Sequence, residues 1–218
     1  MIRLPTSLVV RLDGNNVVLH TLTAAYSWDG ASASDITGTW TASTADQLGR
    51  MVTYVRGGTI WIARINEANA MDKWDGAAAS FANVAAAPTG RDITSVGPYL
   101  VVGAAGGDNY AVQWNSLNDI DTWPATNLAR LVDTPGKIVA VRALTPLSVA
   151  VYKEDSVYLG TLQASKTAFQ FQLVAYLAGP VSTAALVSAL GAHHWLGDNM
   201  TIMRFDGTRG MTRKQIAA

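Results

Sequence analysis

The arginine, tyrosine and acidic side chains of this sequence are the residue types that could grip and cleave an acidic sugar. That chemistry needs several guanidinium groups in one pocket to bind the carboxylate of the sugar. The same pocket must also hold a tyrosine nucleophile and an acidic partner. The arginines recur throughout the chain, as Arg56, Arg64, Arg91, Arg142 and Arg204. Nothing in their spacing gathers them at one site. We therefore expect no catalytic residues and no enzyme activity.

Metal and cofactor chemistry have equally little support. The chain has no cysteine, which excludes disulfides, zinc–thiolate sites and thiol catalysis. His193 and His194 lie in an apolar, strand-like segment, where adjacent side chains point to opposite faces and cannot easily share one metal. The glycines from Gly103 to Gly107 precede a strand-like segment and lack the lysine of a phosphate-binding loop. We expect no metal, no cofactor and no small-molecule substrate.

The composition indicates an ordered, weakly charged chain. Apolar residues make up 49% of its 218 residues and charged residues 15%, which favours a sizeable core over disorder. Sixteen basic and sixteen acidic residues cancel, which argues against a general nucleic-acid binder. We expect no signal peptide and no membrane helix. The low charge favours a surface largely covered by other subunits.

The elements that must position these residues are β-hairpins. Two β-rich runs meet at Gly57-Gly58, and glycine tolerates the positive φ of a tight hairpin turn. Similar runs meet at turns centred near residues 14, 108, 154 and 198. The turns recur about every 46 residues, which is typical of propeller blades. The sequence predicts an all-β, propeller-like array of about five antiparallel β-hairpin or blade repeats.

An aromatic residue before a polar turn marks the same period. These residues are Trp28, Trp74, Trp114, Tyr158 and Phe205, and we expect each to end the second strand of its hairpin. A single sheet cannot bury its faces alone, so the aromatic residues should pack blade on blade. Asp29, Asp75 and Asp206 follow three of them and should cap turns. The ring closes only if the first and last strands share a blade; otherwise the array is open or part of a larger ring.

A single domain covers residues 1–218, because no linker or charge block divides the chain. Its repeats should span roughly residues 1–42, 43–90, 91–136, 137–182 and 183–218. Residues 182–194 form the best helix candidate, a short one ended by Gly191. Their position favours an outer blade strand or a loop instead.

The second half of the chain resembles bacteriophage tail proteins of the hub or nozzle type, as found in short-tailed phages. The resemblance rests on the Trp114–Trp123 segment QWNSLNDIDTWP and on Thr134-Pro135-Gly136-Lys137. The hairpin VAVYKEDSVYLG and a final MRFDG follow in order. The first half matches only through YSWDG and KWDG. This resemblance implies a propeller-like body and a structural role.

Such a role implies a cyclic ring of copies, with six as the family's usual number, that forms part of the DNA-exit conduit. The implied partners are a portal-adaptor protein, tail fibre or spike proteins, and phage DNA that passes through the lumen without sequence-specific contact. The protein would be made in the bacterial host cytoplasm and would reside in the virion. The interface candidates are Trp28, Trp74, Trp114, Trp123, Tyr158, Phe205, Arg213 and Lys214. The last two belong to a basic tail that is either a solvated end or a contact with a subunit or DNA.

A carbohydrate-binding propeller, either a lectin or an Asp-box sialidase-like protein, is the alternative. In this reading one or two of the tryptophans stack on sugar rings. Part of the Asp-box frame of sialidase-type propellers fits Ser116, Asn118, Thr122 and Trp123, and in the first repeat Asp35, Thr39 and Trp40. An Asp-box stabilises a turn through side-chain bonds to backbone N–H groups. It therefore supports a propeller but supplies no catalysis.

Overall fold

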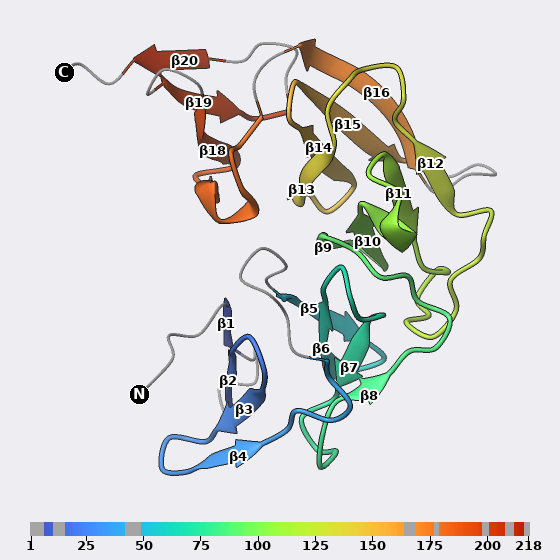
Figure 1. Ribbon diagram of the computed structural model, residues 1–218, viewed down its shortest axis with the longest axis vertical. Helices are drawn as coiled ribbons and strands as arrows, with labels where there is room; N and C mark the ends of the chain where they lie inside the picture. The colour runs from blue at the N-terminus through green and yellow to red at the C-terminus, as the bar shows by residue number, and fades with distance from the viewer. Residues whose placement is uncertain are drawn as a thin grey trace.

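The computed structural model is a curved row of five antiparallel β-sheets (Figure 1). It describes residues 7–10, 16–41, 49–163, 169–176, 179–197, 201–207 and 212–215, and the side chains of 7–10 and 212–215 are not part of that description. Each sheet has four strands that follow one another in the chain and pair with their neighbours in sequence. The predicted all-β, propeller-like array of five repeats is confirmed.

The five sheets are called blades 1 to 5 in chain order. Blade 1 holds β1 (Ser7–Val10), β2 (Val17–His20), β3 (Ala25–Trp28) and β4 (Ala33–Asp35). Blade 2 holds β5 (Arg50–Arg56), β6 (Thr59–Ile65), β7 (Asp72–Trp74) and β8 (Ala82–Asn83). Blade 3 holds β9 (Asp92–Val96), β10 (Tyr99–Gly103), β11 (Ala111–Trp114) and β12 (Leu128–Arg130), with the 3₁₀ turn η1 (Ala105–Gly107) before β11.

Blade 4 holds β13 (Ile138–Thr145), β14 (Ser148–Lys153), β15 (Ser156–Leu162) and β16 (Phe169–Tyr176). Blade 5 holds β17 (Leu186–Ala189), β18 (Ala192–Gly197), β19 (Thr201–Phe205) and β20 (Thr212–Gln215), preceded by the 3₁₀ turn η2 (Thr183–Ala185). Each predicted repeat range contains one of these blades. Residues 182–194 supply the first strand of blade 5 and not an outer strand, which corrects that expectation.

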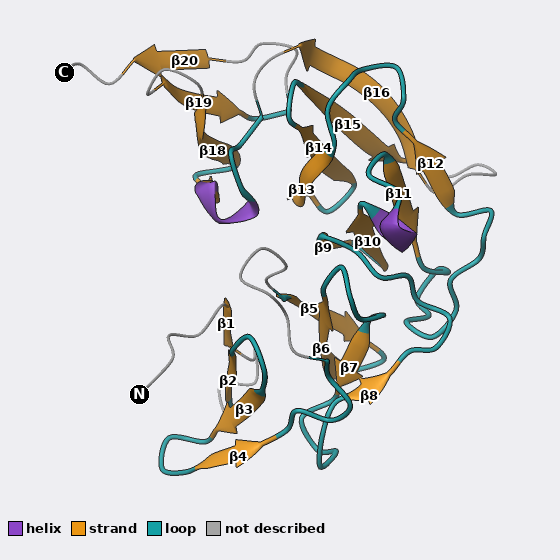
Figure 2. Cartoon of the chain, viewed as in Figure 1, coloured by secondary structure: helices purple, strands orange, loops and turns teal. Residues whose placement is uncertain are grey.

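The first strand of each blade lies toward the inside of the curve. β1 contacts β5, β5 contacts β9, and β9 contacts β13, while β4, β8, β12 and β16 lie on the outside (Figure 1). Loops and the two 3₁₀ turns make up the rest of the described chain (Figure 2). No helix in the described ranges is long and apolar enough to span a membrane.

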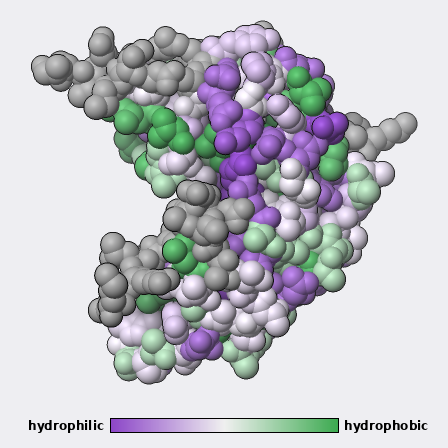
Figure 3. Space-filling model, in the orientation of Figure 1, coloured by the Kyte–Doolittle hydropathy of each residue, from purple (hydrophilic) through white to green (hydrophobic). Residues whose placement is uncertain are grey.

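The row does not close on itself. The described strands of blade 1 and blade 5 belong to separate sheets with no shared strand. The two end blades lie on opposite sides of an opening that is visible in the ribbon and on the molecular surface (Figures 1 and 3). The described strands therefore do not close the ring within this chain, and the array is either open or part of a larger ring, as the sequence left it.

The predicted hairpins are present, but they are not equivalent from blade to blade. In blades 1 and 2 they join the first and second strands, whereas in blades 3 to 5 they join the second and third. The missed turns between the second and third strands are built without glycine. Thr21 Oγ1 accepts the N–H of Ala24 in blade 1, and Asn66 Oδ1 accepts the N–H groups of Ala68 and Asn69 in blade 2. The marker aromatic residue lies on the third strand in all five blades.

The hydrophobic core is a series of clusters that lie between blades. One cluster joins blades 1 and 2, and the next joins blades 2 and 3. Two more join blades 3 and 4 and blades 4 and 5. Each interior blade therefore buries both of its faces, one against each neighbour, which is the packing expected of a repeat array.

Candidate functional site

Five of the six predicted aromatic residues are buried in the contacts between blades. Their side chains are at most 6% exposed. Trp74 lies between blades 1 and 2, Trp123 between blades 2 and 3, Trp114 and Tyr158 between blades 3 and 4, and Phe205 between blades 4 and 5. Trp28 differs from the others, because 43% of it is exposed on blade 1. The structure thus spreads these residues over four interfaces and does not gather them at one site.

The contact between blades 3 and 4 is the richest in aromatic rings. Phe169 forms edge-to-face pairs with Trp114 and Tyr99, with ring centroids 5.4 and 5.6 Å apart and interplanar angles of 74° and 72°. Phe171 packs on Trp114 at 6.1 Å. Edge-to-face pairs of this kind stabilise beyond their buried area, because the ring edge is positive and the ring face negative.

A fully buried lysine fixes the chain between the same two blades. The Nζ of Lys153 donates to the carbonyl oxygens of Leu131 and Thr134 at 2.6 and 2.5 Å, and to Thr134 Oγ1 at 2.9 Å. The ring of Tyr110 lies 4.8 Å from the same nitrogen. Burial lowers the pKa of Lys153, and the three oxygen acceptors offset the cost of burying its charge.

The turn after Lys153 forms further hydrogen bonds with the Thr134–Lys137 segment. The N–H of Lys137 donates to Glu154 Oε2 at 3.0 Å, and the N–H of Glu154 donates to the carbonyl of Lys137 at 3.1 Å. Gly136 has a φ of 79°, and a Cβ there would lie 2.9 Å from Asp155 Oδ2. Two of the four segments on which the phage-tail resemblance rests, residues 134–137 and the hairpin of residues 149–160, therefore meet at this junction, where their polar residues fix blade 4 against the loop from blade 3.

On the inside of the curve, side chains of β9 accept hydrogen bonds from backbone N–H groups of β13, as the backbone of a paired strand would. The buried carboxylate of Asp92 accepts the N–H of Val141 at 2.8 Å and pairs with Arg142. Thr94 Oγ1 accepts the N–H of Ala143 at 3.0 Å. Burial raises the pKa of Asp92, while the adjacent guanidinium of Arg142 opposes that rise. Two alternate residues of one blade thus satisfy two alternate N–H groups of the next.

His193 fixes blade 5 to blade 4 in a similar way. Its Nε2 lies 3.0 Å from the carbonyl oxygen of Ala143, which can only accept, so Nε2 carries the proton. Nδ1 then accepts from the hydroxyl of Tyr152 at 2.6 Å. Burial lowers the pKa of His193 and raises that of Tyr152. His194 lies on the opposite face of β18, as predicted, and the described residues contain no group of three metal-ligating side chains.

Arg64 is a structural residue between blades 1 and 2. Its guanidinium lies 4.2 Å from the ring centroid of Trp40 and 4.1 Å from that of Phe81. It also donates to Asp72 Oδ2 at 2.7 Å and to the carbonyl of Thr37. Sequence reasoning missed this role, although Arg64 continues the alternating face of β6 that buries Ile62, and that period is the signal that could have revealed it.

The arginines considered for catalysis do not converge within the described structure. Each pairs with a different carboxylate: Arg56 with Asp119, Arg64 with Asp72, Arg91 with Glu67, Arg142 with Asp92 and Arg204 with Asp206. These pairs belong to different blades and loops. Their guanidinium groups are therefore engaged separately.

Asp29 and Asp75 cap turns, as expected from their equivalent positions. Asp29 Oδ1 accepts the N–H groups of Ala31 and Ser32, each at 2.8 Å. Asp75 Oδ1 accepts the N–H groups at the two corresponding positions of its own turn. These bonds lower the pKa of Asp29. In the Asp-box-like segment the cap is Asp119, which accepts the N–H of Asp121, whereas Asn118 adopts a left-handed backbone conformation.

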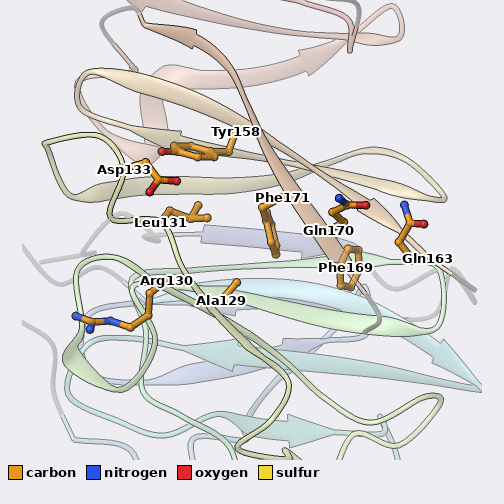
Figure 4. A pocket seen from close by; sticks show the side chains of 9 residues that line it. All are labelled: Ala129, Arg130, Leu131, Asp133, Tyr158, Gln163, Phe169, Gln170 and Phe171. Atoms are coloured by element: carbon orange, nitrogen blue, oxygen red, sulfur yellow. The ribbon is translucent and has the colours of Figure 1, made fainter. Parts of the chain in front are cut away.

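A groove of about 450 Å³ opens between the outer strands of blades 3 and 4 (Figure 4). Phe169 and Phe171 line it, and the side chain of Arg130 extends away from it toward Asp108, 2.7 Å distant. Asp133 is the one carboxylate among its described lining residues. Glycoside hydrolysis generally uses a pair of carboxylates, and the described residues that line this groove do not include such a pair.

The two basic residues that were predicted to make contacts lie in the last strand. Arg213 and Lys214 belong to β20, where they pair in register with Met203 and Ile202. Their side chains lie outside the described residues. The structure therefore gives their place in the sheet and nothing of their contacts.

No family model and no curated protein matches the chain. Solved structures do match. The extracellular domains of a putative one-component and a putative hybrid two-component system from B. thetaiotaomicron align over 98% of this chain, at 12% and 15% identity and TM-scores of 0.64 and 0.65. The alignment covers only 28% of each of those chains.

A β-propeller domain of known structure also aligns with this chain. The β-propeller domain of Cps50 (Swd1) from Myceliophteria thermophila aligns over 83% of this chain and 58% of its own, at 12% identity and a TM-score of 0.52. At such identities the likeness concerns the fold alone. Together with the five sheets in series, it shows that this chain has a β-propeller-like fold.

Proposed function

We propose that this chain is a structural protein of a bacteriophage virion, a component of the tail hub or nozzle ring. The observation that carries the proposal is the junction of blades 3 and 4. There two of the segments that resemble tail proteins, residues 134–137 and the hairpin of residues 149–160, contact each other through Lys153, Glu154 and Thr134. Polar residues that fix one blade against the next favour a rigid protein whose role depends on its shape.

The rest of the molecule supports a role without turnover. The buried aromatic residues pack blades, and the arginines are engaged in separate ion pairs. A net formal charge of zero suits the wall of a channel through which DNA passes without being bound tightly. In this proposal the partners are further copies in a cyclic ring, six by the family's usual number, a portal-adaptor protein, and tail fibre or spike proteins.

The test is to locate the chain in an intact particle. Antibody fragments raised against the recombinant protein should label the tail of gradient-purified particles in electron micrographs, at the level where DNA leaves. Mass spectrometry of the same particles should detect the chain together with the capsid protein. Particles that contain capsid and portal proteins but lack this chain would exclude the proposal.

A carbohydrate-binding propeller is the second candidate, and the groove between blades 3 and 4 favours it. The groove combines the ring of Phe171 with the amides of Gln163 and Gln170, a mixture suited to a sugar. A glycan array with the purified chain separates the two candidates. We expect no signal above that of a Gln170→Glu variant. Tight binding that Gln170→Glu abolishes would favour the lectin.

A further inference from the structure

The two ends of the row each present a sheet face that has no neighbouring blade. Every interior blade packs on a blade at each side, through the four clusters described above. Blade 5 uses one face against blade 4, and blade 1 uses one face against blade 2. The opposite face of each end blade points out of the row. Its composition therefore decides whether it is a solvated end or an unfilled contact.

The outward face of blade 5 is apolar at its centre. Trp195 and Met203 pair in register and point toward blade 4. Because side chains alternate along a strand, Leu196 and its register partner Ile202 point away from blade 4, and they are 38% and 41% exposed. Val187 on β17 lies on the same face and is 57% exposed. Hydrophobic residues are also visible on the blade 5 side of the opening in Figure 3.

The outward face of blade 1 is apolar and aromatic. Val18 and Ala25 are buried against blade 2. The alternate residues Val17, Leu19 and Tyr26 are half-buried, and Trp28, the register partner of Val17, is 43% exposed. This face explains why Trp28 is the exception among the marker aromatic residues. No blade formed by the described residues covers it.

We propose that blade 1 of one copy packs on blade 5 of another, so that copies join head to tail through the two open ends. The proposed contact repeats a kind of interface that the chain already makes four times. Each interior blade packs one face on the blade before it and the other face on the blade after it. Among the described sheets, none follows blade 5 and none precedes blade 1. A symmetric contact between two fifth blades would leave the face with Trp28 uncovered.

The two faces also match in chemistry. Blade 5 places His194 and Arg204 in register beside Val187, and the Arg204 side chain is 43% exposed. Blade 1 offers the rings of Tyr26 and Trp28. The chain already packs a guanidinium between aromatic rings at the contact of blades 1 and 2, where Arg64 lies between two of them. A head-to-tail contact is heterologous, and it yields a closed ring or an open filament according to its angle.

Light scattering on size-separated protein tests the proposal with one variant at each end. Leu196→Glu with Ile202→Glu removes the blade 5 face, and Val17→Glu with Trp28→Glu removes the blade 1 face. The wild-type chain should form species larger than a dimer, and each double variant alone should be monomeric. An equimolar mixture of the two variants should form a dimer and nothing larger, because each still has the one face that the other needs.

The control carries the same charges elsewhere. Leu117→Glu with Leu147→Glu changes two side chains that are 61% exposed in loops, and it should assemble like the wild type. Circular dichroism should confirm that every variant is folded. A wild-type chain that stays monomeric up to about 100 μM overturns the proposal. So does a double variant that still forms dimers by itself, which is the mark of a symmetric contact.

Cross-linking gives a second measurement that does not rely on disruption. The chain has no cysteine, so Trp28→Cys and Leu196→Cys each introduce one defined thiol. A short bismaleimide should join the two variants when they are mixed and should leave each one unlinked alone. Linkage within a single variant, or none in the mixture, overturns the proposal. The contact specifies how the copies of the proposed ring join, and it rests on that part of the proposed function. Particle labelling and self-association can fail independently, so the two failures are distinguishable.

Discussion

Individual buried polar residues set how one blade lies on the next. Apolar faces are non-directional and would tolerate small shifts between sheets. Asp92, Lys153 and His193 instead reach a defined backbone group of a neighbouring segment. An unpaired buried polar group is costly, so these bonds penalise any other arrangement of the blades.

Lys153→Met should lower the free energy of unfolding by about 3 kcal/mol, because it leaves the carbonyl groups of Leu131 and Thr134 without their donor. Urea denaturation followed by tryptophan fluorescence measures the change. Lys137→Met is the matched control, since the Lys137 side chain is 50% exposed. It should change the stability by less than about 0.5 kcal/mol. Equal effects of the two substitutions would contradict the role given to Lys153.

The stability of the protein should decrease on mild acidification. Burial, aided by the charge of Arg64, lowers the pKa of the fully buried His20 from 6.5 to about 4. The unfolded chain then binds more protons than the folded chain between these values, so stability present above pH 6.5 is lost as the pH falls through 4. The shift is worth about 3 kcal/mol for this residue. The pKa of His193 is lowered too and acts in the same direction.

Urea denaturation at a series of pH values between 7.5 and 4 measures this loss. His20→Gln should flatten the dependence on pH, whereas His194→Gln, at a half-buried position on the outward face of β18, should retain it. An unchanged slope in His20→Gln would show that other groups cause the acid loss.

At the scale of elements, the sequence revealed the repeat because each blade has one turn or aromatic marker that stands out. Gly57-Gly58 is such a turn, with φ values of 55° and 80°. The turn at Thr21 is formed by a hydroxyl group and that at Asn66 by an amide. Side-chain caps of this kind leave a weaker trace than paired glycines. The repeats and their hairpins were therefore found, while the expectation that the marker residue ends the second strand of its hairpin is wrong for the first two blades, where Trp28 and Trp74 lie one strand later.

The contacts between blades were predictable in kind but not in detail. Aromatic residues at a regular interval indicate packing between repeats, and Trp74 and Phe205 do pack there. The loop partners of Arg64 and Lys153, such as the carbonyl groups of Thr37 and Thr134, could not be foreseen, because they are distant in sequence. The exposure of Trp28 was missed for a different reason. A sequence repeat does not show whether another blade covers the outward face of an end blade.

Gly57 offers a test of the turn that the sequence identified best. A Cβ at this position meets no atom within 4 Å, so only its positive φ restricts substitution. Gly57→Asn should change the stability by less than about 0.5 kcal/mol, since Asn-Gly suits the same turn. Gly57→Val should destabilise by about 1–2 kcal/mol, because a β-branched residue disfavours positive φ. Thermal melts of the two variants measure the difference, and equal melting temperatures would contradict the assigned turn geometry.

The whole molecule is close to one-dimensional, because each blade packs mainly on the blades before and after it. The stability of such an array is approximately the sum of the blade stabilities and the interfaces between neighbours. Blades 2, 3 and 4 have two interfaces each, whereas blades 1 and 5 have one. The structure therefore predicts a gradient of local stability along the chain, with its maximum in the middle.

Hydrogen–deuterium exchange measures that gradient and its response to assembly. In dilute, monomeric protein the amides of β10 and β14 should exchange most slowly, and those of β2, β3, β18 and β19 faster, because end blades open without breaking a second interface. At concentrations where copies associate, protection should rise at β2 and β3 together with β18 and β19, while β10 and β14 change little. Protection that rises at one end alone would mean that the two outward faces do not meet.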